Sequence, residues 1–131
     1  LEGAGAYAEY LDTYARIDIA LDPFPYTGGT TTAESLWMGV PVVTLKGDRF
    51  IAHQGESLLH AAGLSEMIAA DKEAYVQLAL NFAADRPALA AMRAGLRARV
   101  AASALFDAPR YARALETAWH GMWAEWCARQ R

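Results

Sequence analysis

One segment, residues 17–45, places the strongest constraint on how this chain can fold. It reads IDIALDPFPYTGGTTTAESLWMGVPVVTL. Ile17–Leu21 and Val40–Leu45 are short apolar runs bounded by turn residues, a pattern that predicts two buried strands. Between them Ala33–Met38 favours a short helix that Gly39 ends. The segment therefore predicts the strand, loop, helix and strand of a parallel α/β unit.

A glycine-rich turn opens the helix of this unit. Gly28 and Gly29 precede three consecutive threonines. In a parallel α/β unit such a turn places free backbone N–H groups and the positive end of a helix dipole at the carboxyl end of the sheet, where anions bind. We therefore predict a phosphate site in which the hydroxyls of Thr30 and Thr31 contact a diphosphate. Glu34, one turn further on, would accept from two ribose hydroxyls.

The same residues have an explanation that involves no ligand. Thr31 and Glu34 stand at the T-x-x-E spacing of a capping box, in which each side chain bonds the backbone of the other residue. A capping box would account for both residues, and the local sequence leaves the two interpretations open.

A helix is also expected over residues 6–15, where apolar residues recur at spacings of three and four. Three of them are tyrosines. These rings either form the half-buried face of an amphipathic helix, or Tyr10 provides a stacking surface for a nucleotide base. Residues 1–5 are expected to form a loop or the end of a strand.

The rest of the chain predicts further helices and one more strand. We expect a helix over Phe50–Ala62 that Gly63 ends, a strand at Met67–Ala69, a helix capped by Asp71 and another that begins near Pro87. The last helix, at about residues 109–129, carries an aromatic stripe whose members are Tyr111, Leu115, Trp119, Met122, Trp123 and Trp126. Such a stripe indicates packing, and we expect part of it to cover a domain outside this chain.

Composition excludes several classes of function. The 131 residues suit a single domain, 1–131, and the net charge of −3 argues against an electrostatic nucleic-acid binder. No apolar run approaches the roughly 20 residues of a membrane span, so we expect no membrane partner. The single cysteine, Cys127, fits a reducing cytoplasm. The first residue is not Met, and we expect the chain to be part of a longer protein.

Neither a metal site nor a catalytic nucleophile stands out. Asp18 and Asp22 do not form an Asp-x-Asp pair, and the three histidines are isolated in sequence. No Ser-His-Asp order with a supporting motif is visible. We therefore expect no metal, no cofactor and no catalytic residue within this chain.

Longer stretches show a family resemblance. The run DIALDPFPYTGGTTTAESLWMGVPVVTLKGDRF, with the later GESLLHAAGLSEMIA and SALFDAPRYARALETAWHGMW, resembles the carboxyl-terminal catalytic half of the O-linked N-acetylglucosamine transferase and SPINDLY family. The resemblance covers almost the whole chain. It implies the second domain of a two-domain GT-B glycosyltransferase: a Rossmann-like, three-layer α/β domain with a parallel sheet, ending in a long helix.

The resemblance also implies site residues. Thr30 and Thr31 match the family's diphosphate contacts, and Glu34 matches its ribose contact, where animal enzymes have Asp. Tyr10 stands where animal members place a histidine against the base. Gly29 also replaces a histidine of those members, and His53 and Gln54 stand where relatives often have Arg and Val. The implied nucleotide-sugar site comprises Tyr10, Gly28, Gly29, Thr30, Thr31 and Glu34.

The implied reaction is the inverting transfer of a sugar, N-acetylglucosamine from UDP-GlcNAc, to serine or threonine of an acceptor protein, without a metal. The general base and acceptor groove would belong to an N-terminal catalytic domain that packs on the last helix, so this chain alone would be inactive. Two alternatives stay open: a protein O-fucosyltransferase that uses GDP-fucose, and a non-catalytic α/β module that binds other proteins.

Overall fold

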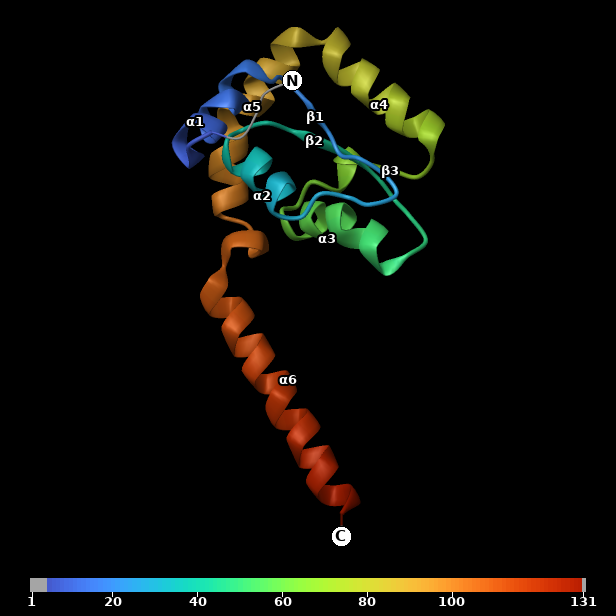
Figure 1. The fold of residues 1–131 in the computed structure, drawn as a ribbon, viewed down its shortest axis with the longest axis vertical. Coiled ribbons are helices and arrows are strands. Elements are labelled where there is room, and N and C mark those ends of the chain that lie inside the picture. Colours follow the sequence, from blue (N-terminus) through green and yellow to red (C-terminus); the bar gives the residue numbers. More distant parts are fainter. Residues whose placement is uncertain (1–4, 131) are drawn as a thin grey trace.

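The computed structural model describes residues 5–130 (Figure 1). At its centre three short parallel strands lie in the order β1-β2-β3, with bounds Ala20–Leu21, Val42–Leu45 and Ile68–Ala69. Ala20 lies opposite Val42, and Thr44 lies opposite Ile68. The three predicted strands are confirmed, although β1 is shorter than Ile17–Leu21 because only its last two residues pair with β2. The expectation for residues 1–5 falls, apart from Gly5, outside the described part.

Six α-helices are present in residues 5–130: α1 Tyr7–Asp12, α2 Thr30–Trp37, α3 Gln54–Ala61, α4 Lys72–Ala84, α5 Arg86–Ala101 and α6 Ala108–Arg129. Short 3-10 turns occupy Thr13–Arg16, Phe50–His53, Ser65–Met67 and Ala104–Phe106. The helices predicted over residues 6–15 and Phe50–Ala62 are therefore shorter than expected. Thr13–Arg16 and Phe50–His53 are wound as 3-10 turns instead. Helix α2 begins at Thr30, three residues before the predicted start.

The helix ends predicted at Gly39 and Gly63 and the helix starts predicted at Asp71 and Pro87 are confirmed. Gly39 and Gly63 have φ of 77° and 71°, the left-handed conformation that glycine adopts at low cost after a helix. The Asp71 carboxylate accepts a 2.7 Å hydrogen bond from the backbone N–H of Ala74 at the start of α4. Pro87 lies in the first turn of α5. These residues fix where each helix meets the sheet.

Helices cover both faces of the sheet. On one face Val42 packs in a buried cluster with side chains of α2, α3 and α5, among them Leu36, Leu59, Leu96 and Val100. On the other face Leu21 lines an apolar hollow with residues of α4, and the Tyr75 hydroxyl of α4 donates a 2.9 Å hydrogen bond to the Asp22 carbonyl. This is the predicted three-layer α/β arrangement.

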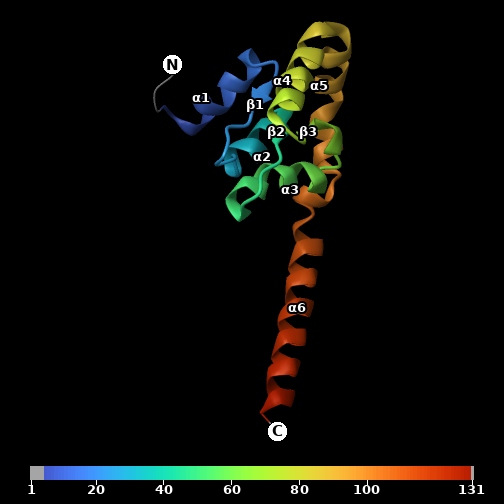
Figure 2. The ribbon, with the colours of Figure 1, turned by 90° about the vertical axis from the view of Figure 1, so that its right-hand side faces the viewer.

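The last helix leaves this body. Figures 1 and 2 show α6 running away from the sheet and its covering helices. Its aromatic stripe is exposed, with 58, 63 and 53% of Trp119, Trp123 and Trp126 accessible. The rings of Trp123 and Trp126 stack on each other, with centroids 5.1 Å apart. Among the described residues, no helix is both long and apolar enough to cross a membrane.

Candidate functional site

The predicted glycine-rich loop connects β1 to α2 at the carboxyl end of the sheet. Gly29 precedes the first helical residue, Thr30, and no side chain accepts a hydrogen bond at this cap position. The start of α2 therefore presents its dipole and backbone donors without a capping oxygen, which suits an anionic ligand.

The loop and the helix start border an open hollow of about 470 Å³. Its lining brings together both predicted diphosphate contacts, Thr30 and Thr31, with earlier residues of the loop and one residue of α3. The lining residues are Pro23, Tyr26, Thr27, Gly28, Gly29, Thr30, Thr31 and Gln54. The sequence prediction did not include Gln54, whose first-turn position in α3 becomes part of the site only through the fold.

Thr31 and Glu34 do not form the capping box that their spacing allows. Thr31 is the second residue of α2 and not its N-cap, so its hydroxyl cannot serve as the capping acceptor. The Glu34 carboxylate instead accepts from two tyrosines of α1: 3.0 Å from the Tyr7 hydroxyl to Oε1 and 2.9 Å from the Tyr10 hydroxyl to Oε2. The Glu34 carboxylate therefore joins α2 to α1 and does not cap its own helix.

The tyrosines form a connected group beside Glu34. The hydroxyls of Tyr10 and Tyr14 lie 2.6 Å apart, and the buried Tyr14 donates to the Thr31 carbonyl at 3.4 Å. The pKa of Tyr10 is raised, first by burial and then by its hydrogen bonds to Tyr14 and Glu34, so its hydroxyl stays protonated. Both predicted nucleoside residues, Tyr10 and Glu34, are brought together here. Two further tyrosines contact this pair: Tyr7 bonds Glu34, and Tyr14 bonds Tyr10.

Asp22 connects the loop to the sheet. Its Oδ1 accepts a 2.6 Å hydrogen bond from the Gly28 N–H, and its Oδ2 accepts a 2.7 Å bond from the Thr44 hydroxyl of β2. Only 3% of Asp22 is exposed, and burial raises its pKa while the bonds from Thr44 and Gly28 act in the opposite direction. The local sequence does not indicate this role for Asp22. Its structural role depends on Thr44, 22 residues away.

Thr27 joins the same loop to the start of α3. Its hydroxyl donates to the Ile51 carbonyl and accepts from the Gly55 N–H, both at 3.2 Å. The loop is thus fixed at both ends, by Asp22 to the sheet and by Thr27 to α3, before any ligand binds.

Gly28 is required by the closeness of its neighbours. A Cβ at this position would lie 2.5 Å from the Thr32 hydroxyl, 2.8 Å from that of Thr31 and 3.1 Å from Asp22 Oδ1. Any side chain would therefore displace the hydroxyls at the start of α2.

No group of three or more His, Cys, Asp or Glu side chains within residues 5–130 is placed to hold a metal ion. Asp18, the other aspartate considered, lies at the surface and pairs with Arg93 at 2.7 Å. The polar groups that line the hollow are hydroxyl and amide groups.

Comparison with known proteins gives consistent matches. Residues 6–115 match the model of glycosyl transferase family 41. The chain is 44% identical over 119 residues to a probable UDP-N-acetylglucosamine–peptide N-acetylglucosaminyltransferase SPINDLY of Oryza sativa subsp. japonica, which covers 91% of this chain and 13% of the rice protein. It is 33% identical over 106 residues to the UDP-N-acetylglucosamine–peptide N-acetylglucosaminyltransferase of Caenorhabditis elegans, covering 81% of this chain and 9% of that protein.

A solved structure shows the same fold. The K341M mutant of Thermobaculum terrenum O-GlcNAc transferase matches with a TM-score of 0.92 and 38% identity, over 100% of this chain and 25% of that one. The expected GT-B-type domain is confirmed by this match. The chain spans about an eighth of the length of the curated SPINDLY relatives.

Proposed function

The chain belongs to glycosyl transferase family 41, and on this premise we propose that it binds the donor nucleotide of an inverting glycosyltransferase. The sugar, N-acetylglucosamine from UDP-GlcNAc, would pass to serine or threonine of an acceptor protein. The observation that carries this proposal is the open hollow at the uncapped start of α2, with Thr30 and Thr31 in its lining and the Glu34–Tyr10 pair one turn away.

We assign the hollow to the diphosphate and the neighbouring Glu34–Tyr10 pair to the nucleoside. The hydroxyls of Thr30 and Thr31, with the N–H groups of the first turn of α2, donate to the diphosphate. Glu34 accepts from the ribose hydroxyls, because each of its oxygens keeps a free acceptor position beside the bond from a tyrosine. The ring of Tyr10 stacks on the base.

The chemical contribution of this site is stabilisation of the leaving group. Negative charge develops on the diphosphate as the bond to the sugar breaks, and fixed donors at a helix N-terminus stabilise that charge. Removing one such donor costs about 3 kcal/mol of the barrier in enzymes with comparable sites. We propose that this arrangement acts without a metal ion, so that chelators leave the rate unchanged.

The relatives are much longer than this chain, and we assign the general base and acceptor groove to the parts of such proteins that it does not match. The exposed stripe of α6 is the surface we propose for packing against such a part. Tryptophan emission should then shift to shorter wavelength, relative to the 131-residue chain, when any flanking sequence is included. An unchanged spectrum would argue against this packing.

We propose the cytoplasm as the compartment, in line with the single cysteine.

A transfer assay tests the reaction. The protein, with any flanking sequence that its gene encodes, is incubated with a Ser/Thr peptide and either UDP-GlcNAc or GDP-fucose, and the glycopeptide is measured by mass spectrometry. Transfer from UDP-GlcNAc supports the proposal. Transfer from GDP-fucose alone would favour the fucosyltransferase alternative, since Tyr10 can stack on either base. No transfer from either donor would favour the protein-binding module.

A further inference from the structure

The start of α3 contributes a side chain to the donor hollow that the family resemblance leaves without a role. Gln54 is the first residue of α3 and lines the hollow together with the Gly28–Thr31 loop. Its backbone position is fixed, because Thr27 bonds both Ile51 and Gly55 on either side of it. The place of Gln54 beside the loop is therefore built into the fold.

The absence of a side chain at Gly29 gives Gln54 its space. A Cβ added at Gly29 would meet one atom within 4 Å outside its chain neighbours, Oε1 of Gln54, at 3.3 Å. A larger residue at position 29 would compete with the Gln54 amide for the same volume. With glycine at position 29, the side chain that occupies this space comes from Gln54 of α3.

The amide of Gln54 is available to a ligand. Among the described residues, neither of its amide atoms has a hydrogen-bond partner. The amide of Gln77 on α4, by contrast, donates to Asn81 at 2.8 Å. Gln54 therefore presents one acceptor and two donors to the hollow.

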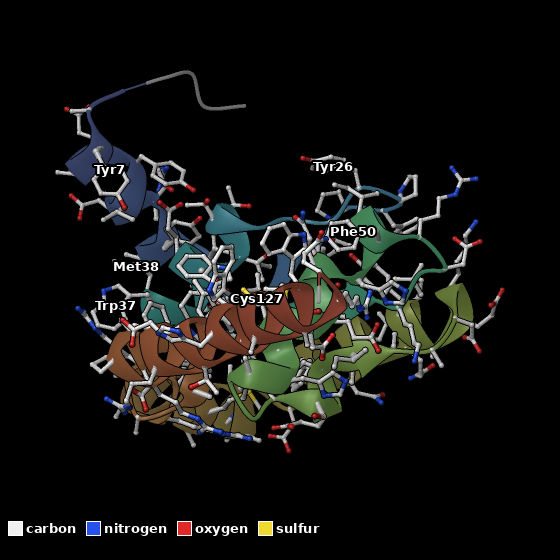
Figure 3. All side chains as sticks on the ribbon, turned by 90° about the horizontal axis from the view of Figure 1, so that it is seen from below. Tyr7, Tyr26, Trp37, Met38, Phe50 and Cys127 are labelled. Atoms are coloured by element: carbon white, nitrogen blue, oxygen red, sulfur yellow. The ribbon has the colours of Figure 1, made fainter. Side chains whose placement is uncertain are left out.

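The order of the groups along the site indicates which part of the donor would meet this amide. Glu34 lies one turn after Thr30 and Thr31 on α2, whereas Gln54 lies beside the preceding residue, Gly29, whose Cβ position is 3.3 Å from Gln54 Oε1. Gln54 and Tyr26 both line the hollow. Figure 3 shows Tyr7, next to Glu34, and Tyr26 well separated across the same view. If the nucleoside lies at Glu34 and the diphosphate at Thr30 and Thr31, the sugar lies next to Gln54.

We propose that Gln54 contacts a hydroxyl or N-acetyl group of the donor sugar and contributes to sugar selection. The proposal rests on the proposed function. A sugar hydroxyl, like an amide, both donates and accepts, so the two groups pair fully. A phosphate oxygen can accept only from Nε2 of this amide, whereas a sugar hydroxyl can pair with either its Nε2 or its Oε1.

Two ligands that differ only by the sugar test this role. Calorimetry gives the Kd of UDP and of UDP-GlcNAc for the wild type and for Gln54→Met, which keeps length but removes the amide; GDP and GDP-fucose are measured in the same way. Gln77→Met is the matched control, since it removes an amide that does not line the hollow. Gln54→Ala serves as a second variant, and circular dichroism checks that each variant is folded.

We expect Gln54→Met and Gln54→Ala to raise the Kd of the nucleotide sugar about fivefold, the effect of one lost hydrogen bond, while the Kd of the free nucleotide changes less than about twofold. Gln77→Met should change neither. Equal changes for nucleotide and nucleotide sugar, or no change for either, would overturn the role of Gln54 and leave the proposed function intact. No binding of any of the four ligands to the wild type would overturn both.

Discussion

The Tyr10 hydroxyl donates a 2.9 Å hydrogen bond to Oε2 of Glu34 across 24 residues of sequence. This bond joins α1 to α2 and connects the two residues proposed to bind base and ribose. Tyr7 holds the other carboxylate oxygen at 3.0 Å, so the orientation of Glu34 is set before a nucleotide arrives. Such preorganisation lowers the entropy lost on binding.

Removing the Tyr10 hydroxyl separates its two roles. Tyr10→Phe keeps the ring but loses the bonds to Glu34 and Tyr14, and we expect a loss of about 1 kcal/mol in the free energy of unfolding, measured with urea. Tyr10→Ala also removes the ring, and should weaken nucleotide binding by a further 1–3 kcal/mol or so. Equal nucleotide affinity of Tyr10→Phe and Tyr10→Ala would show that the ring does not stack on the base.

Asp22 should be intolerant of amide substitution. Both of its carboxylate oxygens accept from donors, Gly28 N–H and Thr44 Oγ1, so the NH₂ group of Asp22→Asn would face one of those donors. We expect a loss of about 1–3 kcal/mol in the free energy of unfolding. The matched control is Asp18→Asn at the exposed pair with Arg93, which should cost less than about 1 kcal/mol. Equal stability of the two variants would contradict the role given to Asp22.

Two glycine substitutions should act in opposite directions. Gly28→Ala places a methyl group 2.5 Å from the Thr32 hydroxyl and should both destabilise the fold and weaken nucleotide binding. Gly95→Ala, in α5, meets no atom within 4 Å and should stabilise the protein by about 0.5–1 kcal/mol. Thermal unfolding and nucleotide titration measure both effects. If Gly28→Ala bound nucleotide as the wild type does, the loop would not be part of the site.

Glu56 should make stability depend on acid pH. Its carboxylate lies 2.6 Å from His53 Nδ1 and 3.2 Å from Lys46 Nζ, and the His53 bond is the main cause of its lowered pKa. A lowered pKa in the folded state adds stability above the ordinary value of 4.5, and that stability is lost as the pH falls below 4.5 through the folded pKa.

Urea unfolding across this pH range checks the expectation. Glu56→Gln should show a weaker loss of stability with falling pH than the wild type, because it lacks the titrating group. Glu73→Gln, on the exposed part of α4, is the control and should follow the wild type. The same slope for Glu56→Gln and the wild type would rule out the contribution of Glu56.

Features encoded by neighbouring residues could be predicted from the sequence. The apolar runs, the double glycine, and the glycines after α2 and α3 define the strands, the loop and the helix ends within a few residues. The threonines were placed at the hollow for the same reason, since a loop between a parallel strand and its helix lies at the carboxyl end of the sheet.

Features that depend on distant partners could not be predicted. The spacing of Thr31 and Glu34 indicates a capping box, but two tyrosines of α1 bind the carboxylate instead, and nothing in the local pattern encodes that contact. Asp22 and Gln54 were missed for a related reason. Thr44, Gly29 and the loop approach them only when the sheet and α3 are assembled.

The most direct test of the account is calorimetric titration of UDP and GDP into the wild type and into Thr30→Ala combined with Thr31→Ala. Thr117→Ala on α6 is the control, because its hydroxyl bonds only its own helix, at the Arg113 carbonyl. We predict that the wild type and Thr117→Ala bind one of the nucleotides, and that the double variant binds it more than tenfold more weakly, as expected for two lost bonds to a charged group. Unchanged affinity in the double variant, or no binding of either nucleotide to the wild type, would contradict the assignment of this hollow as the donor site.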